Sequence, residues 1–109
     1  IVNLGGDNIS PSKIENLLCL NEKIKQSYVY GDKKTYLVAL VVSDSDENKK
    51  EIENYLENLN KSLSSVEKVK KFMLIKEEFT IENGMLTPTL KLKRNKILEK
   101  YKNNLEKLY

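Results

Sequence analysis

The stretch Tyr36-Leu37-Val38-Ala39-Leu40-Val41-Val42 is an unbroken apolar run near the middle of the chain. A run of this kind, with no alternating polar residues, is typical of a strand whose two faces are both covered. We therefore predict that residues 36–42 form the central strand of a sheet. Tyr28–Tyr30 are predicted to form a neighbouring strand, and the turn residues Gly31–Thr35 would join the two as a hairpin.

Helical periodicity is found on both sides of these strands. Ser10-Pro11 provides an N-cap hydroxyl and then a proline at the first helical position, where its missing N–H costs nothing. Apolar residues spaced by three or four predict a long helix over residues 46–70, with Ser64-Ser65 as a candidate break, and a closing helix that includes Ile97–Leu108. Cys19, at the end of the first helix, is predicted to be a small buried hydrophobe.

Short extended segments complete the pattern. Residues 1–9, divided by the glycine turn at residues 5–6, are predicted to form a small hairpin, and residues 72–75 a third strand. Asn83-Gly84 predicts a two-residue hairpin turn, because both residues tolerate positive φ, and Pro88 would end the pairing that follows. The expected fold is α+β: a small antiparallel or mixed sheet with flanking helices and a short N-terminal hairpin.

Composition excludes several classes of function. The chain has 109 residues, enough for a single domain, and a mild net charge of +3. It has one cysteine and no histidine, so internal disulfides, Cys/His catalysis and histidine-containing metal sites are excluded, and no metal site is expected. No apolar run approaches the ~20 residues of a membrane span, and no signal peptide is visible. We therefore expect a cytoplasmic protein.

Two segments carry a resemblance to a known family. The first is Gly5-Gly6-Asp7-Asn8-Ile9-Ser10-Pro11, followed by Ile14-Glu15-Asn16-Leu17-Leu18. The second contains Glu82-Asn83-Gly84 and the specific run Leu86-Thr87-Pro88-Thr89-Leu90-Lys91-Leu92-Lys93-Arg94. Over its whole length the chain resembles the C-terminal domain of bacterial long-chain fatty acyl-CoA synthetases, which belong to the adenylate-forming superfamily.

The resemblance implies an enzyme that joins a fatty acid, ATP and coenzyme A in two steps. The first would make an acyl-adenylate and pyrophosphate, and the second a thioester and AMP. Residues 1–109 would be the small, mobile C-terminal domain, whereas the N-terminal domain that holds ATP and the acyl chain would be absent from this chain. ATP, Mg²⁺ and coenzyme A are thus expected for the intact enzyme. The isolated domain is expected to be inactive and to bind none of them tightly.

The resemblance also implies roles for individual residues. Lys91 matches the superfamily's catalytic lysine, which would neutralise charge during adenylation; many relatives have Ser-Gly before it, whereas this chain has Thr89-Leu90, as the long-chain branch does. Gly5-Gly6 matches a loop beside the coenzyme A channel, although from the residues alone a tight turn is the ordinary interpretation. Lys93 and Arg94 are candidates for contacts with phosphates of ATP or coenzyme A.

Two alternatives remain open. Six basic residues lie between Lys91 and Lys102 against Glu99 alone, which would suit a small basic binding module, but no nucleic-acid-binding motif is present and we expect no nucleic-acid partner. The last helix could instead contact a membrane surface through its apolar stripe, which the domain's own core also needs. A weak peripheral association of the whole enzyme with the inner face of the membrane stays open as an expectation.

Overall fold

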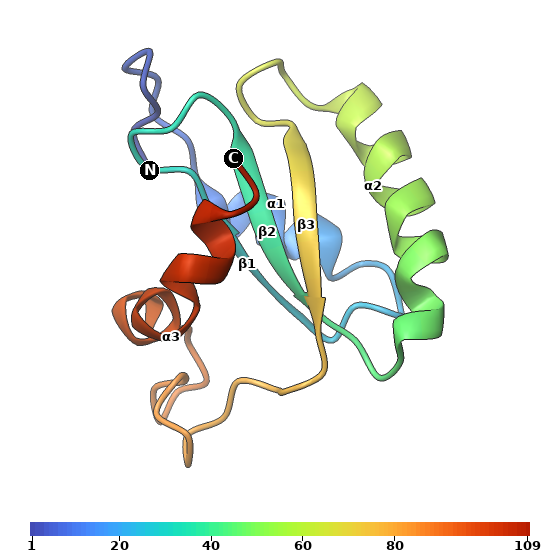
Figure 1. Ribbon diagram of the computed structural model, residues 1–109, viewed down its shortest axis with the longest axis vertical. Helices are drawn as coiled ribbons and strands as arrows, with labels where there is room; N and C mark the ends of the chain where they lie inside the picture. The colour runs from blue at the N-terminus through green and yellow to red at the C-terminus, as the bar shows by residue number, and fades with distance from the viewer.

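The sheet is built around the predicted central strand. The structure, a computed structural model, describes residues 1–109. Its elements are α1 (Pro11–Leu18), β1 (Gln26–Tyr30), β2 (Leu37–Val42), the short 3-10 helix η1 (Asp46–Asn48), α2 (Lys49–Ser62), β3 (Val69–Ile75) and α3 (Arg94–Glu106). The strand order is β1-β2-β3, so β2 lies between its two neighbours (Figure 1). The α+β prediction is confirmed.

The three strands form a mixed sheet. β1 pairs with β2 in antiparallel fashion, with Tyr28 opposite Leu40, whereas β3 pairs with β2 in parallel, with Met73 opposite Leu40. All six residues of β2 are buried, because helices cover both of its faces. The apolar run is thus explained by the central position of β2 in the sheet, which confirms the prediction from the sequence.

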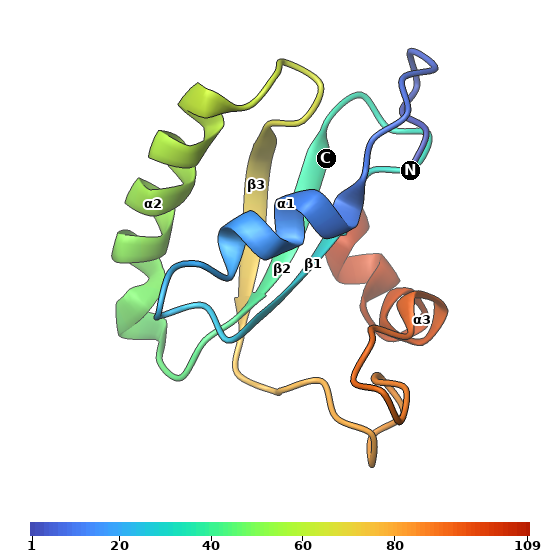
Figure 2. The ribbon, with the colours of Figure 1, turned by 180° about the vertical axis from the view of Figure 1, so that it is seen from behind.

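Two apolar clusters fill the space between the sheet and the helices. On one face, Ile14 and Leu18 of α1 and Ile52 of α2 pack against alternate residues of β2. On the other face, Ile97 and Leu105 of α3 pack against the intervening residues (Figures 1 and 2). The apolar stripe of the last helix therefore closes the core.

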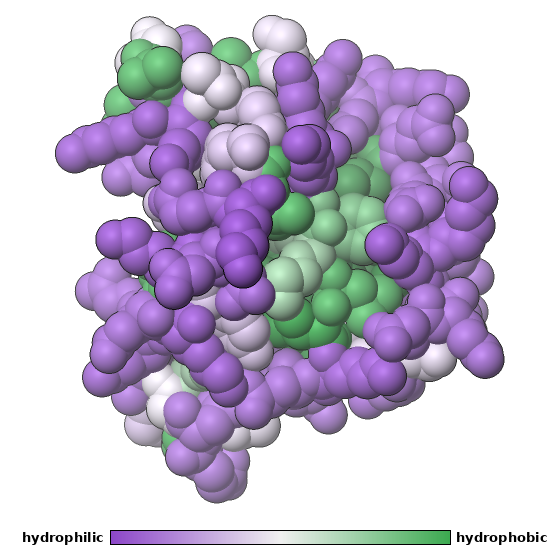
Figure 3. Space-filling view, in the orientation of Figure 1, coloured by the Kyte–Doolittle hydropathy of each residue, from purple (hydrophilic) through white to green (hydrophobic).

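β3 is an edge strand, and part of it is left uncovered. Phe72, Met73 and Leu74 are only half-buried. They border the apolar surface that Figure 3 shows between α3 and α2, and Leu108 lies beside them. Lys70 and Lys71 lie within this strand and Lys76 directly follows it, and charged side chains of this kind discourage edge-to-edge pairing.

The predicted helix over residues 46–70 is wrong at its C-terminal end. α2 ends at Ser62, Leu63 is already extended, and Val69 begins β3. The side chain of Asn60 accepts a hydrogen bond from the Val69 N–H at 3.0 Å and donates one to the Val69 carbonyl at 2.8 Å. Val69 is therefore held in the sheet opposite Leu37. The apolar spacing of residues 63, 66 and 69 imitates a helix, but tertiary pairing outweighs it.

The hairpin predicted around Asn83-Gly84 is also wrong. Only Gly84 has positive φ, and no strands flank the turn. Asn83 Oδ1 instead accepts hydrogen bonds from the backbone N–H groups of Thr80 and Met85, so its side chain replaces strand pairing. Antiparallel pairing occurs just after this turn, as a single β-bridge between Leu86 and Leu92. Pro88 is consequently inside a hairpin loop rather than at the end of a strand.

Cys19 is exposed, which corrects its predicted burial. It follows Leu18, the last residue of the buried stripe of α1, and one residue along a helix turns the side chain by about 100° away from that stripe. Its N–H donates to the Glu15 carbonyl at the end of the helix, and its Sγ lies 3.4 Å from Ser27 Oγ. Cys19 is thus a helix-terminating residue at the surface.

Gly31→Ala is expected to destabilise the domain. A methyl group at Gly31 would overlap Leu37 Cδ2 and lie 3.2 Å from the Tyr36 carbonyl oxygen. Leu37 is fully buried and has no room to move, so we expect a loss of about 1–3 kcal/mol in the free energy of unfolding, measured by urea denaturation. Gly5→Ala is the control, because its methyl group would meet nothing closer than 3.6 Å. Equal midpoints for the two variants would contradict the prediction.

Candidate functional site

Lys91 lies on a hairpin loop that is braced by its own backbone. The Leu86–Leu92 bridge closes the loop, and the Thr87 N–H donates to the Lys91 carbonyl at 2.8 Å. The Lys91 N–H in turn donates to Thr87 Oγ1 at 3.1 Å. The Lys91 side chain is exposed and forms no hydrogen bond or ion pair with the rest of the domain. A braced loop therefore holds the Lys91 ammonium group at the surface, where it is free to bind a ligand or another protein surface.

An ion pair directly after this loop joins it to the body of the domain. Arg94, the first residue of α3, donates from both terminal nitrogens to the Glu15 carboxylate, at 2.6 and 2.9 Å. The same carboxylate accepts the Val29 N–H at 2.7 Å, and Glu15 is only 6% exposed. The hydrogen bonds that Arg94 donates to Glu15 raise the pKa of Arg94, so the guanidinium stays charged. The pair thus ties the start of α3 to α1 and β1.

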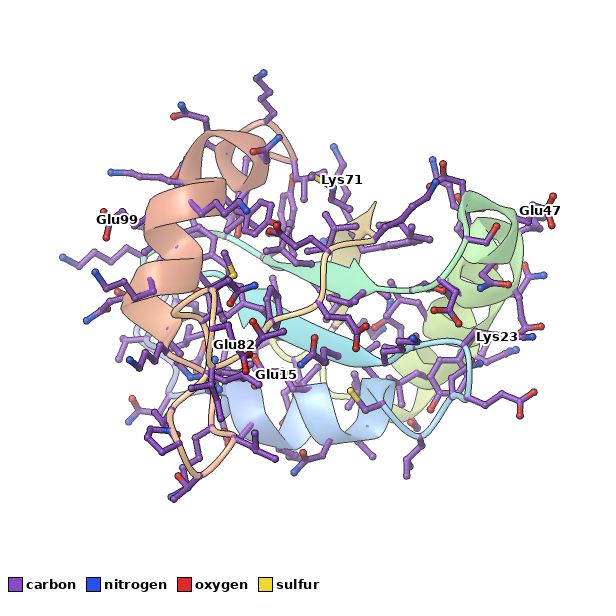
Figure 4. All side chains as sticks on the ribbon, turned by 90° about the horizontal axis from the view of Figure 1, so that it is seen from below. Glu15, Lys23, Glu47, Lys71, Glu82 and Glu99 are labelled. Carbon is purple, nitrogen blue, oxygen red and sulfur yellow. The ribbon has the colours of Figure 1, made fainter.

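Sequence reasoning did not single out Glu15, although a signal was present. Glu15 lies between Ile14 and Leu18 on the helix that covers the sheet (Figure 4). A carboxylate on a buried helical face needs a partner, because an unpaired buried charge is strongly unfavourable. The partner, Arg94, is 79 residues away, and no local pattern could have identified it.

Lys93 and Arg94 have different surroundings. Lys93 is exposed, and its backbone links the loop to the helix: its N–H donates to the Met85 carbonyl at 2.8 Å, and its own carbonyl accepts the Ile97 N–H at 3.1 Å. Its side chain is free, whereas the Arg94 guanidinium is engaged with Glu15. The expected contacts of both residues with phosphates stay predictions.

A groove of about 580 Å³ runs between α1, β1 and the Lys91 loop. It is lined by polar and basic groups and by leucines of the loop, of which Leu90 is the exposed one. The residues that line it include Ser12, Glu15, Lys25, Leu90, Lys91 and Arg94. Glu15 is paired with Arg94, and Lys25 is paired with Asp44 at 2.6 Å. Lys91 is therefore the lining residue whose positive charge is free to attract a negatively charged ligand.

Gly5-Gly6 forms the tip of the N-terminal hairpin, at the opposite end of the domain. Val2 and Asn8 pair across this hairpin, which confirms its prediction. Gly6 has a φ of +86°, and a methyl group at Gly6 would meet no atom within 4 Å. Figures 1 and 2 show the hairpin at the top of the molecule and the segment that carries Lys91 at the bottom. The fold therefore keeps Gly5-Gly6 and Lys91 far apart, so they do not form one site within this domain.

The structure has neither a metal-binding cluster nor a membrane-spanning helix. No group of three or more His, Cys, Asp or Glu side chains is placed to hold a metal ion. None of the three helices combines the length and the apolar character that crossing a membrane requires.

Comparison with known proteins assigns the chain to a family. The sequence model of the AMP-binding enzyme C-terminal domain matches residues 1–109, the whole chain. The chain belongs to this family. Among curated relatives of this AMP-binding C-terminal domain is long-chain-fatty-acid–CoA ligase 6 of Rattus norvegicus, 36% identical over 129 residues. That match covers 95% of this chain and 18% of the rat protein.

A bacterial relative gives the same result. Long-chain-fatty-acid–CoA ligase FadD15 of Mycobacterium tuberculosis is 30% identical over 133 residues, a match that covers 100% of this chain and 22% of the relative. The AMP-binding C-terminal domain therefore spans about a fifth of the length of the curated relatives that it matches. The resemblance to long-chain fatty acyl-CoA synthetases is confirmed.

Solved structures share the fold. The adenylation domain of the carboxylate reductase from Mycobacterium chelonae is 29% identical, with a TM-score of 0.87 over 100% of this chain and 19% of that one. The adenylation domain of carboxylic acid reductase from Segniliparus rugosus, in complex with AMP and a co-purified carboxylic acid, is 29% identical, with a TM-score of 0.86 over 100% of this chain and 19% of that one. The AMP-binding C-terminal domain fold is thus that of adenylate-forming enzymes.

Proposed function

We propose that this domain is the mobile C-terminal domain of a long-chain fatty acid–CoA ligase. It supplies Lys91 to the adenylation step and Gly5-Gly6 to the channel for coenzyme A. The observation that carries the proposal is the free ammonium of Lys91 on a braced loop, in a chain whose relatives include long-chain-fatty-acid–CoA ligases. The opposite position of the bare glycine tip supports the second role.

In the first step, a carboxylate oxygen of the fatty acid attacks the α-phosphorus of ATP. A new P–O bond forms, the bond to the bridging oxygen breaks, and pyrophosphate leaves. Negative charge accumulates on the phosphate oxygens in the transition state, and the Lys91 ammonium stabilises it. A lysine suits this task because it is a compact cation on a flexible stem. Mg²⁺ would enter with the phosphates of ATP, and this domain offers no cluster of ligands for it.

In the second step, the thiolate sulfur of coenzyme A attacks the acyl carbonyl carbon. A C–S bond forms, the bond between the acyl carbon and the phosphate oxygen breaks, and AMP leaves. Lys91 and the glycine tip lie at opposite ends of the domain, so they cannot occupy one active site in one orientation. This placement supports a turn of the domain between the steps, which would remove Lys91 and bring in Gly5-Gly6. A tip without side chains leaves room for a narrow thiol channel.

The test is a pair of assays on the full-length protein that carries this domain. We expect fatty-acid-dependent exchange of labelled pyrophosphate into ATP, and acyl thioester formation when coenzyme A is added. The absence of exchange with every long-chain fatty acid would contradict the proposal. Titration of the protein with oligonucleotides and with liposomes at two salt concentrations tests the two alternatives.

Gly5→Trp is expected to slow thioester formation roughly 10–100-fold while pyrophosphate exchange continues. Gly5 is the better position for added bulk, because Gly6 has positive φ and any side chain there would also strain the backbone. Gly5→Ala is the matched control and should behave almost as the wild type. The two half-reactions are measured separately on the same protein. An equal loss in both would show a folding defect and would remove support for the channel assignment.

A further inference from the structure

The residue before Lys91 has an unusual backbone conformation. Leu90 has a φ of +64°, in the left-handed region that a leucine rarely adopts. It is the last residue of the three-residue hairpin loop Pro88-Thr89-Leu90, and its N–H donates to the Thr87 carbonyl at 2.8 Å. In hairpins of this kind the left-handed position usually carries glycine.

Backbone hydrogen bonds hold the loop closed, but packing of the Leu90 side chain inside the domain does little to offset this strain. The Leu90 side chain is 67% exposed and lines the same groove as Lys91. A glycine would fit the backbone better, and an exposed leucine gains little from packing within this domain. Strain of this type, kept at an exposed position, is found at sites where a loop must present a group to a ligand or partner.

The position of Leu90 in the chain indicates what it contacts. Its Cα is ~3.8 Å from that of Lys91, so a surface that receives the Lys91 ammonium must pass close to Leu90. The chain spans about a fifth of the length of its curated relatives. In the proposed function, the surface that Lys91 meets is that of the large domain of the same enzyme. An apolar side chain at the rim of such a site excludes water and fixes the approach of the loop.

We propose that Leu90 is a positioning residue for adenylation: it packs on an apolar surface of the large domain beside the active site and sets the depth at which Lys91 enters. The Leu90 side chain is largely exposed in this domain, which leaves it free for this contact. The inference rests on the proposed function, because it needs a large domain that Lys91 enters.

The test compares Leu90→Ala and Leu90→Gly in the full-length protein. Both variants lose the apolar contact, and we expect pyrophosphate exchange to fall roughly tenfold in Leu90→Ala and at least as much in Leu90→Gly, the effect of removing one buried anchor. Thioester formation from supplied acyl-adenylate should keep its wild-type rate in both, which shows that the domain is folded. Leu90→Met, which keeps the apolar bulk, should restore exchange.

Lys33→Gly is the matched backbone control. Lys33 also has positive φ, at +61°, but lies in the exposed turn between β1 and β2, so its replacement relieves a similar strain and should leave exchange unchanged. Exchange within twofold of wild type in both Leu90→Ala and Leu90→Gly would overturn the inference, as would equal losses in the two half-reactions. If the wild type itself shows no fatty-acid-dependent exchange, the proposed function has failed, and the inference fails with it.

Discussion

Lys91→Ala is expected to slow adenylate formation roughly 10²–10³-fold in the full-length protein, the effect of removing one preorganised group that stabilises transition-state charge. This corresponds to about 3–4 kcal/mol of lost stabilisation. The ammonium of Lys91 has no partner inside the domain, so its removal should leave the free energy of unfolding almost unchanged. Pyrophosphate exchange measures the adenylation step directly.

The decisive comparison is between the two half-reactions of the same variant. Thioester formation from supplied acyl-adenylate should survive in Lys91→Ala, because in the proposed function Lys91 leaves the site before that step. Lys93→Ala is the matched control: Lys93 is also an exposed lysine with a free side chain, two residues along the chain, and its loss should be far milder. A normal exchange rate in Lys91→Ala, or equal losses in both steps, would show that Lys91 is not the adenylation lysine.

Arg94→Ala is expected to lower the free energy of unfolding by about 3 kcal/mol, because it leaves the buried Glu15 carboxylate without a counter-charge. The value lies at the lower end of the range for buried ion pairs because the Arg94 side chain is 36% exposed. For a domain of this size the loss corresponds to a fall in Tm of roughly 12–18 °C. Thermal unfolding of residues 1–109, followed by circular dichroism, measures it.

Lys76→Ala serves as the control for the ion pair. Lys76 and Asp46 form an ion pair at 3.2 Å, but both side chains are more than half exposed. Its removal should change the free energy of unfolding by less than about 0.5 kcal/mol. If Arg94→Ala proved as mild as Lys76→Ala, the Glu15–Arg94 pair would not be the link that holds the Lys91 loop to α1 and β1.

Much of the fold was predictable because its signals are local. The seven apolar residues at 36–42 indicate the central strand, since a short unbroken run of this kind is typical of a strand covered on both faces. Ser10 caps α1 as predicted, with its hydroxyl accepting the Lys13 N–H. The stripe from Ile97 to Leu105 identifies the helix that closes the core. The family was recognisable because the run Leu86–Arg94 is specific.

Other features required the assembled fold. Val69 has helical spacing but lies in a strand, because it pairs with Leu37 and the Asn60 side chain holds it there. The hairpin expected at Asn83-Gly84 is replaced by hydrogen bonds to the Asn83 side chain. In both cases a weak local preference gave way to contacts that form only when distant segments meet.

In the candidate site, too, some features follow from the local sequence and others from the tertiary structure. The motif identifies Lys91, but its free ammonium depends on the absence of any carboxylate within reach in the folded domain. The Glu15–Arg94 pair joins residues 79 apart, and the left-handed φ of Leu90 follows from closure of the loop by the Leu86–Leu92 bridge. Residue types and short-range periodicity are properties of the sequence itself. Charge partners and loop strain depend on three-dimensional proximity, which no short stretch of sequence contains.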